Sequence, residues 1–234
     1  MPSENLIYVA DSEYTPYGDK SERQIEARVL AIAEHLLNQK AKAIVVACNT
    51  ATAAAVQTLR NRYSIPIIGL EPALKPASEH TASARVGVLA TQATLDSQKY
   101  QDLKEKFAQQ LELIERASPF FVELVESAPD ITEVEMALIE KELQPFVKAK
   151  IDSLVLGCTH YPFLTKAISS IMGPKVALFE SGFPVAKEVQ RRLEGKLTNT
   201  NQKGKIEYYS SNPQKSQQIF DCLLENKTQI TKFS

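Results

Sequence analysis

Two cysteines stand in matching positions in this sequence, each after a short apolar run and directly before a helical pattern. Cys48 follows the run 43–47, and Cys158 follows the run 153–156 after one glycine. A helix N-terminus favours a thiolate, because its N–H groups and the helix dipole carry partial positive charge. A thiolate on one face of a carbon atom and a thiol on the other can invert that carbon by proton transfer. The two positions therefore predict an acid–base pair that acts on a stereocentre.

The surroundings of the two cysteines look like two copies of one plan. In 42–75 and in 150–187, a buried strand leads to the cysteine, a helix follows, and a second strand ends in a glutamate. That glutamate comes 23 residues after Cys48 and 22 residues after Cys158. The spacing indicates a duplicated strand–helix–strand unit with one cysteine in each copy.

Other roles for these cysteines fit the pattern less well. A single buried cysteine after a strand usually serves as a small apolar side chain. Two of them occur here, and the residues that follow them can hold a carboxylate: Asn49, Thr50, Thr159 and His160. Cys48, Cys158 and His160 lack the regular spacing of a zinc site, so no metal site is predicted. Cys222 lies in a C-terminal helical pattern and is interpreted as structural.

Strand and helix patterns alternate along the whole chain. Strands are predicted at 6–10, 43–47, 65–69, 85–90, 111–115, 153–156, 176–179 and 206–209. Helices are predicted from 21, from the first cysteine to about 62, at about 95–108, from 132, after 162 and at 184–193. Strands separated by helices of this length predict an α/β fold with parallel sheets.

Capping boxes mark the start of two of these helices. Ser21 with Gln24 and Thr132 with Glu135 have the required spacing of three residues. Apolar residues at helical spacing around the second box are expected to face the core: Ile131, Val134 and Leu138.

Composition limits the class of protein. The 234 residues are 44% hydrophobic and carry a net charge of −1, so no global basic field holds nucleic acid or an anionic membrane. The N-terminus has neither the basic nor the apolar region of a signal peptide, and the apolar runs are too short for a membrane span. Three cysteines cannot pair completely, which predicts free thiols in the reducing cytoplasm.

The segments around the cysteines resemble the two cysteine signatures of glutamate racemases. These segments are Ala47-Cys48-Asn49-Thr50-Ala51-Thr52 and Leu156-Gly157-Cys158-Thr159-His160-Tyr161-Pro162. Further matches follow in family order: Tyr8-Val9-Ala10-Asp11, Pro16-Tyr17-Gly18, Ala90-Thr91 through Thr94, and Leu124-Val125-Glu126. The resemblance covers about residues 5 to 193. It implies two Rossmann-like (flavodoxin-like) α/β lobes related by pseudo-two-fold symmetry, with the site in the cleft between them.

The resemblance also implies an activity and residue roles. The family interconverts L- and D-glutamate without a cofactor and supplies D-glutamate for peptidoglycan, and so for cell-wall biogenesis and cell shape. By resemblance, Cys48 takes the α-proton of D-glutamate, Cys158 takes that of L-glutamate, and Glu126 and His160 assist the thiols. The implied substrate contacts are Tyr17, Gly18, Asn49, Thr50, Thr91, Thr94, Thr159 and His160.

The sequence departs from the family at its start. The family opens with one more strand and a loop of the type Asp-Ser-Gly-x-Gly-Gly before the segment matched by Leu6. Asp11-Ser12 belongs to the following motif and does not replace that loop. The absent loop would supply an acidic residue for the substrate amine and for assisting a cysteine. Two interpretations stay open, namely a true start upstream of Met1 and a shortened, catalytically impaired relative.

The chain is expected to fold into two lobes. The first lobe is expected to comprise 1–75 and 185–234, and the second 76–184, with one cysteine in each. By resemblance the substrate is glutamate, the chain forms a homodimer, and DNA gyrase is a conceivable protein partner. The alternatives are a racemase of another acidic amino acid, such as aspartate, and a non-catalytic ligand- or protein-binding module on the same scaffold.

Overall fold

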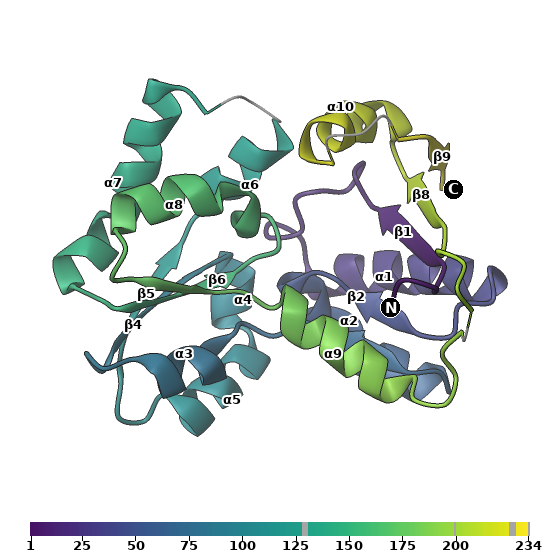
Figure 1. Ribbon diagram of the computed structural model, residues 1–234, viewed down its shortest axis with the longest axis horizontal. Helices are drawn as coiled ribbons and strands as arrows, with labels where there is room; N and C mark the ends of the chain where they lie inside the picture. The colour runs from purple at the N-terminus through teal and green to yellow at the C-terminus, as the bar shows by residue number, and fades with distance from the viewer. Residues whose placement is uncertain (128–130, 199, 225–227, 234) are drawn as a thin grey trace. The chain divides into compact units, whose positions relative to one another are not determined.

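The structure, a computed structural model, describes residues 1–127, 131–198, 200–224 and 228–233. It is a mixed α/β fold, and every strand pairing in the described chain is parallel, as predicted. The contacts divide the chain into two compact units (Figure 1). Unit 1 comprises Met1–Val46, Ala54–Gly69 and Pro184–Ser234, and unit 2 comprises Ala47–Ala53 and Leu70–Phe183.

Unit 2 is built on a four-stranded sheet with the order β5-β4-β6-β7. Its strands are β4 (Arg85–Ala90), β5 (Glu112–Ala117), β6 (Ser153–Gly157) and β7 (Ala177–Phe179). Helices cover both faces (Figure 1): α3 (Leu74–His80) and α5 (Gln98–Phe107) lie on one face, and α7 (Glu133–Ala149) and α8 (Thr165–Met172) lie on the other. Covered faces explain why β4 and β6 are apolar along almost their whole length.

The strand order of unit 2 reverses between β4 and β6. The chain runs from β4 to β5 on one side of β4, and then returns to form β6 on the other side. Ala90, Ala117 and Gly157 lie in register at the carboxyl ends of the three strands. Ligands of open α/β sheets bind at such a reversal, beyond the carboxyl ends of the strands. This edge of unit 2 is therefore the place where a site is expected.

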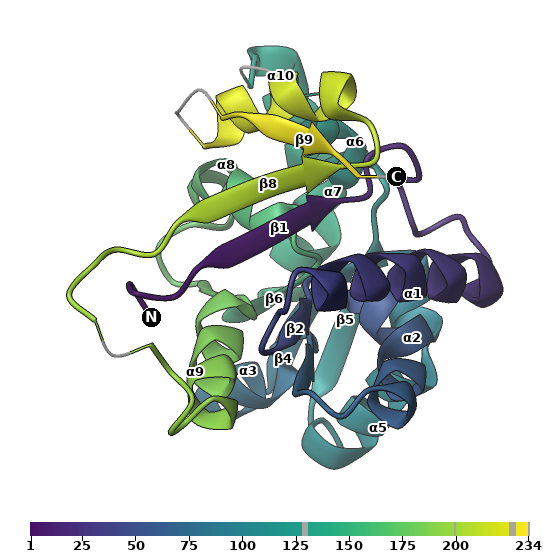
Figure 2. The same cartoon turned by 90° about the vertical axis from the view of Figure 1, so that its right-hand side faces the viewer.

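Unit 1 contains two small parallel sheets instead of one. The first has the order β1-β8-β9, formed by β1 (Leu6–Ala10), β8 (Ile206–Ser210) and β9 (Ile230–Lys232). The second pairs β2 (Ile44–Val46) with β3 (Ile67–Gly69). Within the described chain, β1 and β2 each pair with a strand on one side only (Figure 2). Apolar side chains of these two strands are correspondingly exposed, at 48% for Leu6, 47% for Tyr8 and 38% for Val45.

Among the described residues, four long helices belong wholly or partly to unit 1. They are α1 (Glu22–Asn38), most of α2 (Asn49–Arg62), most of α9 (Gly182–Arg192) and α10 (Pro213–Leu223). Helix α9 packs Val189 against Ile68 of β3. Helix α10 packs Phe220 against the rings of Tyr8 and Tyr208, with centroids 5.6 Å apart in both pairs.

Both predicted capping boxes form. The N–H of Gln24 donates to Ser21 Oγ, and the N–H of Ser21 donates to Gln24 Oε1 at 3.1 Å, so α1 begins where the sequence predicts. Thr132 and Glu135 make the same exchange at the start of α7. These signals are local, and tertiary packing does not override them.

The predicted inward face of α7 is wrong. Val134 is 68% exposed, Leu138 43% and Ile131 38%. The buried positions are Ile139, Leu143 and Phe146, which recur at helical spacing one residue further along. Two apolar stripes compete on this helix, and the larger side chains of the second stripe face the sheet.

The predicted helix at 95–108 is interrupted. Ser97 is extended, with φ −68° and ψ 141°, and separates α4 (Gln92–Asp96) from α5. Its Oγ accepts a hydrogen bond from the N–H of Tyr100 at 3.2 Å, which is an N-cap contact. The serine therefore ends α4 and begins α5 within a polar segment whose composition favours one continuous helix.

Four short elements of the described chain were not predicted from the sequence. They are α3, α6 (Phe120–Glu126), the 3₁₀ turn η1 (Tyr161–Leu164) and β9. Each is seven residues long or shorter, so hydrophobic periodicity has little length in which to show. In the described part of the chain, no helix has the length and hydrophobicity needed to cross a membrane.

Candidate active site

Cys48 and Cys158 occupy equivalent positions in two strand–helix–strand segments. Cys48 lies between β2 and the first residue of α2, and Cys158 directly follows β6. In both segments the two strands pair in parallel, as the duplicated plan predicts. By its contacts, the segment Ala47–Ala53, which includes Cys48 and the first turn of α2, belongs to unit 2, whereas the rest of the helix belongs to unit 1. Both cysteines are therefore described within unit 2, and the lobe boundaries expected from the sequence remain a prediction.

Cys158 begins a chain of three polar groups. Its Sγ lies 3.7 Å from Nδ1 of His160, and Nε2 of His160 lies 2.7 Å from Oε1 of Glu126. Glu126 is the last residue of α6, and His160 precedes η1. The hydroxyl of Tyr161 donates to the carbonyl oxygen of Ser118 at 2.8 Å, so η1 is held against the end of β5. The structure thus brings three of the four predicted catalytic side chains into successive contact, namely Cys158, His160 and Glu126.

Burial favours the protonated form of both thiols. The pKa of Cys158 is raised to about 12: burial is the largest cause, the nearby Cys48 and the charge of Glu126 add to the rise, and the N–H groups of His160 and Thr159 oppose it. Burial also raises the pKa of Cys48, against a smaller lowering by the N–H groups of Ala51 and Thr50. Because a thiolate is the reactive base, either cysteine needs a partner that accepts or stabilises its charge.

Three threonine hydroxyls gather beside the start of α2. Oγ1 of Thr50 lies 2.9 Å from Oγ1 of Thr91 and 3.3 Å from that of Thr94, and the last two are 2.9 Å apart. Thr91 follows β4 at the strand reversal and caps α4. These predicted substrate contacts do lie together, and hydroxyls with helix N–H groups form a suitable environment for a carboxylate.

Asn49 and Thr159 contact the backbone of the opposite cysteine segment. Nδ2 of Asn49 donates to the carbonyl oxygen of Gly157 at 2.9 Å, and Oγ1 of Thr159 donates to that of Ala47 at 3.3 Å. Gly157 has no space for a side chain, because a Cβ there would lie 2.9 Å from the Cβ of Ala90. The close approach of β6 to β4 therefore requires this glycine.

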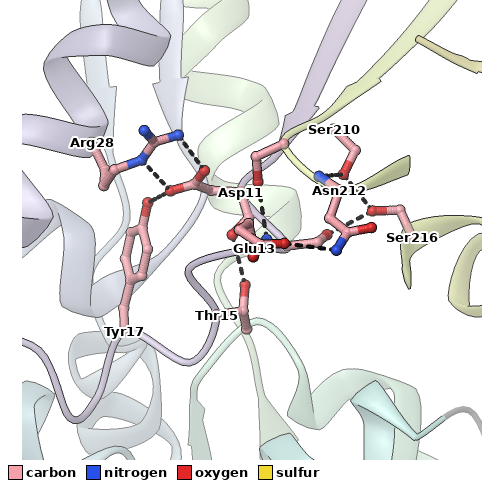
Figure 3. Close-up of polar contacts among 10 residues, drawn as sticks. Asp11, Glu13, Thr15, Tyr17, Arg28, Ser210, Asn212 and Ser216 are labelled. Atoms are coloured by element: carbon pink, nitrogen blue, oxygen red, sulfur yellow. Dashed lines mark hydrogen bonds and ion pairs between the residues drawn. The ribbon is translucent and has the colours of Figure 1, made fainter. Parts of the chain in front are cut away.

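Tyr17 and Gly18 are located in the loop after β1, within unit 1. The hydroxyl of Tyr17 donates to Oδ2 of Asp11 at 2.6 Å, and the guanidinium of Arg28 binds both oxygens of the same carboxylate (Figure 3). Burial alone would raise the pKa of Asp11, but Arg28 and Tyr17 outweigh it and lower the pKa. Gly18 is exposed in this loop. Asp11 is thus a charged anchor that sets the position of Tyr17.

Buried serines fix the other end of the same loop. Oγ of Ser216 lies 2.6 Å from Oγ of Ser12 and 2.6 Å from Oγ of Ser210. Asn212 donates its side-chain amide to Glu13 at 2.7 Å (Figure 3). The loop after β1 is therefore tied to the start of α10.

Ser118 is a residue of the site edge that sequence reasoning missed. It follows β5 at the level of Thr91 and Cys158, and its N–H donates to the carbonyl oxygen of Ala90 at 3.2 Å. The available signal was its place directly after a strand, which is the place that singled out the two cysteines. In the described part of the chain, no group of three His, Cys, Asp or Glu side chains is arranged to hold a metal ion.

Known proteins resemble this chain in both sequence and structure. The family described as Asp/Glu/Hydantoin racemase matches residues 2–182. A glutamate racemase of Methylococcus capsulatus is 46% identical over 215 residues, which are 91% of this chain and 79% of the relative. The crystal structure of Escherichia coli glutamate racemase, in complex with L-glutamate and the activator UDP-MurNAc-ala, has a TM-score of 0.87 at 28% identity. The match covers 99% of this chain and 88% of the Escherichia coli chain. The crystal structure of glutamate racemase from Thermus thermophilus, in complex with beta-chloro-D-alanine, has a TM-score of 0.82 at 33% identity. The match covers 100% of this chain and 88% of the Thermus thermophilus chain.

Proposed function

This chain belongs to the Asp/Glu/Hydantoin racemase family, and on that premise we propose that it interconverts L- and D-glutamate with Cys48 and Cys158 as the two acid–base groups. Its relatives are glutamate racemases, so the chain is an isomerase. The observation that carries the two-thiol proposal is the gathering of both cysteines, with His160 and Glu126, at the strand reversal of unit 2.

The proposed reaction moves one proton off Cα and another proton on. In the L-to-D direction, the thiolate of Cys158 takes the α-proton, and the thiol of Cys48 delivers its proton to the opposite face. Cys158 ends as a thiol and Cys48 as a thiolate, which is the arrangement that the D-to-L direction requires. Both thiols must therefore exchange protons with solvent before the same direction repeats.

His160 and Glu126 supply the partner that Cys158 needs to ionise. An imidazole that donates from Nε2 to Oε1 of Glu126 keeps Nδ1 as an acceptor toward the thiol. The thiol proton then moves to Nδ1, and the carboxylate stabilises the imidazolium that results. Cys48 has a different environment, because its Sγ accepts the N–H of Ala51 at 3.5 Å, in the first turn of α2. The positive helix end stabilises a thiolate at that position.

The remaining predicted contacts are proposed to orient the substrate. Thr50, Thr91 and Thr94 form a hydroxyl cluster suited to one carboxylate, and the N–H groups at the start of α2 add to it. Tyr17 and Gly18 complete the proposed set, whereas the side-chain donors of Asn49 and Thr159 are engaged with the backbone of the opposite cysteine segment. Free thiols require a reducing compartment, which favours the cytoplasm, where D-glutamate would enter peptidoglycan synthesis.

Incubation in D₂O tests the proposed function directly. The purified chain is mixed separately with L-glutamate, D-glutamate, L-aspartate and D-aspartate, and Cα deuteration and optical rotation are followed. Deuteration with loss of rotation for glutamate alone supports the proposal. The same result for aspartate alone supports the other acidic substrate. Binding of glutamate without any exchange of its Cα proton supports a non-catalytic binding module.

Glu126→Gln is expected to lower kcat/KM for glutamate by ~10–100-fold, since a neutral amide does not stabilise an imidazolium at His160. The prediction separates two effects of this carboxylate, because its charge also contributes to the raised pKa of Cys158. If charge repulsion were the dominant effect, removal of the charge would ease ionisation of Cys158, and kcat/KM would stay equal or rise. Glu123→Gln, one turn earlier on the same helix, is the matched control.

We also propose a homodimer that uses an exposed apolar stripe, which consists of Ile131, just before α7, and of Val134 and Leu138 on α7. Acidic Glu133 lies near the start of this helix and basic Lys148 near its end, so two antiparallel copies would bring opposite charges together. Val134→Glu is expected to turn a dimer into a monomer in sedimentation experiments. A wild-type chain that sediments as a monomer at high concentration would contradict the proposal.

A further inference from the structure

The two cysteine segments are tied together by a reciprocal pair of hydrogen bonds. Asn49, directly after the first cysteine, donates to the carbonyl of Gly157, directly before the second cysteine. Thr159, directly after the second cysteine, donates to the carbonyl of Ala47, directly before the first. Each segment supplies one donor and one acceptor. Each cysteine therefore lies between two bonds that lead to the other segment.

The bond from Asn49 is the stronger of the two by its surroundings. Asn49 is only 6% exposed, and both partners of its hydrogen bond are buried. Loss of one partner leaves a buried polar group unsatisfied, which costs ~1–3 kcal/mol. The acceptor is also fixed in place, because Gly157 lies at the end of β6, packed too closely on Ala90 for any side chain. The bond therefore runs from the start of α2 to a rigid strand end.

The hydroxyl cluster supports the same connection from a second direction. Thr50, at the first turn of α2, contacts Thr91 after β4. With the two reciprocal bonds, this contact explains why Ala47–Ala53 group with unit 2, although the remainder of α2 groups with unit 1. The first cysteine is thus positioned from the β4–β6 sheet, as the second one is.

We infer that Asn49 and Thr159 are positioning residues, whose reciprocal hydrogen bonds set the separation and direction of the two thiols before substrate binds. The inference rests on the proposed two-thiol function and deepens it. Two acid–base groups that work on one carbon tolerate little error in their spacing, and a misplacement of about 1 Å costs ~100-fold in rate. A residue that only contacts substrate would act mainly on KM, whereas a positioning residue acts mainly on kcat.

Kinetics of matched variants give the first test. Thr159→Val and Asn49→Leu keep the branching of the side chain and remove the donor, and each is expected to lower kcat ~10–100-fold with KM within about twofold. Thr159→Ser keeps the hydroxyl and is expected to restore most of kcat. Thr58→Val removes a threonine donor from the far half of α2, where it binds Glu26, and serves as the control with unchanged kinetics. Raised KM with unchanged kcat would overturn the inference in favour of substrate contacts.

A substrate-free titration gives a second, independent test. Cys48 raises the pKa of Cys158, so Cys48→Ala should lower the pKa of Cys158 as read from thiolate absorbance. In the Thr159→Val background this effect of Cys48→Ala is expected to shrink by half or more, because the thiols are no longer held together. An undiminished effect would contradict the inference. The titration needs no turnover, so it still decides the role of Thr159 if the chain does not exchange the Cα proton of glutamate and the proposed function fails.

Discussion

Cys48→Ser and Cys158→Ser are each expected to lower kcat/KM for glutamate by ~10³-fold or more, because serine keeps the geometry but is a far weaker acid. In the proposed mechanism every turnover uses one thiol as base and the other as acid, so neither cysteine can be spared in either direction. Cys222→Ser is the matched control. Cys222 is exposed on α10, and its replacement should leave the kinetics unchanged.

The overall rates alone do not reveal which cysteine serves which enantiomer. L- and D-glutamate have equal free energies in water, so the ratio of kcat/KM in the two directions is fixed at one for every variant. Exchange of the Cα proton with solvent, without inversion of Cα, does show which cysteine serves which enantiomer. In D₂O, Cys158→Ser should still deuterate D-glutamate through Cys48, with return to the same face, and should fail to deuterate L-glutamate. Cys48→Ser should show the opposite pattern.

The serine variants also define what would end the two-thiol proposal. A Cys158→Ser chain that racemises glutamate at near wild-type rates in both directions would assign the chemistry to other groups. Equal deuteration of both enantiomers by either single variant would show that one base reaches both faces. Far-ultraviolet circular dichroism and the melting temperature of each variant separate these outcomes from loss of the fold.

Signals that act within a few residues predicted their elements correctly. Ser21 begins α1 because its partner Gln24 is one turn away, and the two cysteine segments form parallel strand–helix–strand units as their spacing implies. Where two apolar patterns compete on one helix, the prediction was wrong. On α7, Val134 was predicted to face the core, but it belongs to the exposed one of two apolar stripes. The outcome there depends on which stripe fits the sheet, and the sequence of one helix does not contain that information.

The arrangement of the site depends on contacts between distant segments. The bond of Asn49 to Gly157 spans 108 residues, and that of Thr159 to Ala47 spans 112. Position directly after a strand was enough to select the polar residues at the sheet edge, because all parallel strands end there. Their pairing was not predictable, since it requires the order of strands in the sheet. The same is true of the split sheet in unit 1.

The second large effect is expected from an added N-terminal strand. The resemblance implies one more strand and an Asp-Ser-Gly-x-Gly-Gly loop before the segment of Leu6. In the described chain, β1 and β2 each have an unpaired edge, and β2 with β3 forms a sheet of only two short strands. Isolated two-stranded sheets are marginally stable, and parallel sheets normally have both faces covered. One parallel strand between β1 and β2 would join both sheets.

A chain that carries this strand and loop is therefore expected to be more stable and more active. Pairing the two edges and partly covering Leu6, Tyr8 and Val45 is worth a few kcal/mol. For a chain of this size, each kcal/mol corresponds to about 2–4 °C in Tm, so the expected rise is roughly 5–10 °C. By resemblance, the loop would also add a carboxylate for the substrate ammonium. We then expect kcat/KM to rise, because an unpaired charge is costly in a desolvated site.

Two extended control chains separate the contributions. An extension with two prolines in the middle of the added strand removes backbone donors and should give no rise in Tm, whereas an Asp→Asn change in the loop should keep the rise in Tm and lose most of the gain in kcat/KM. Differential scanning calorimetry and glutamate kinetics on the original chain and the three extended chains are the measurements. Equal Tm and equal kcat/KM for the original and the fully extended chain would mean that the open edges of β1 and β2 impose no cost. In that outcome, the pairing of β1 with β8 and of β2 with β3 is sufficient for both the fold and the site.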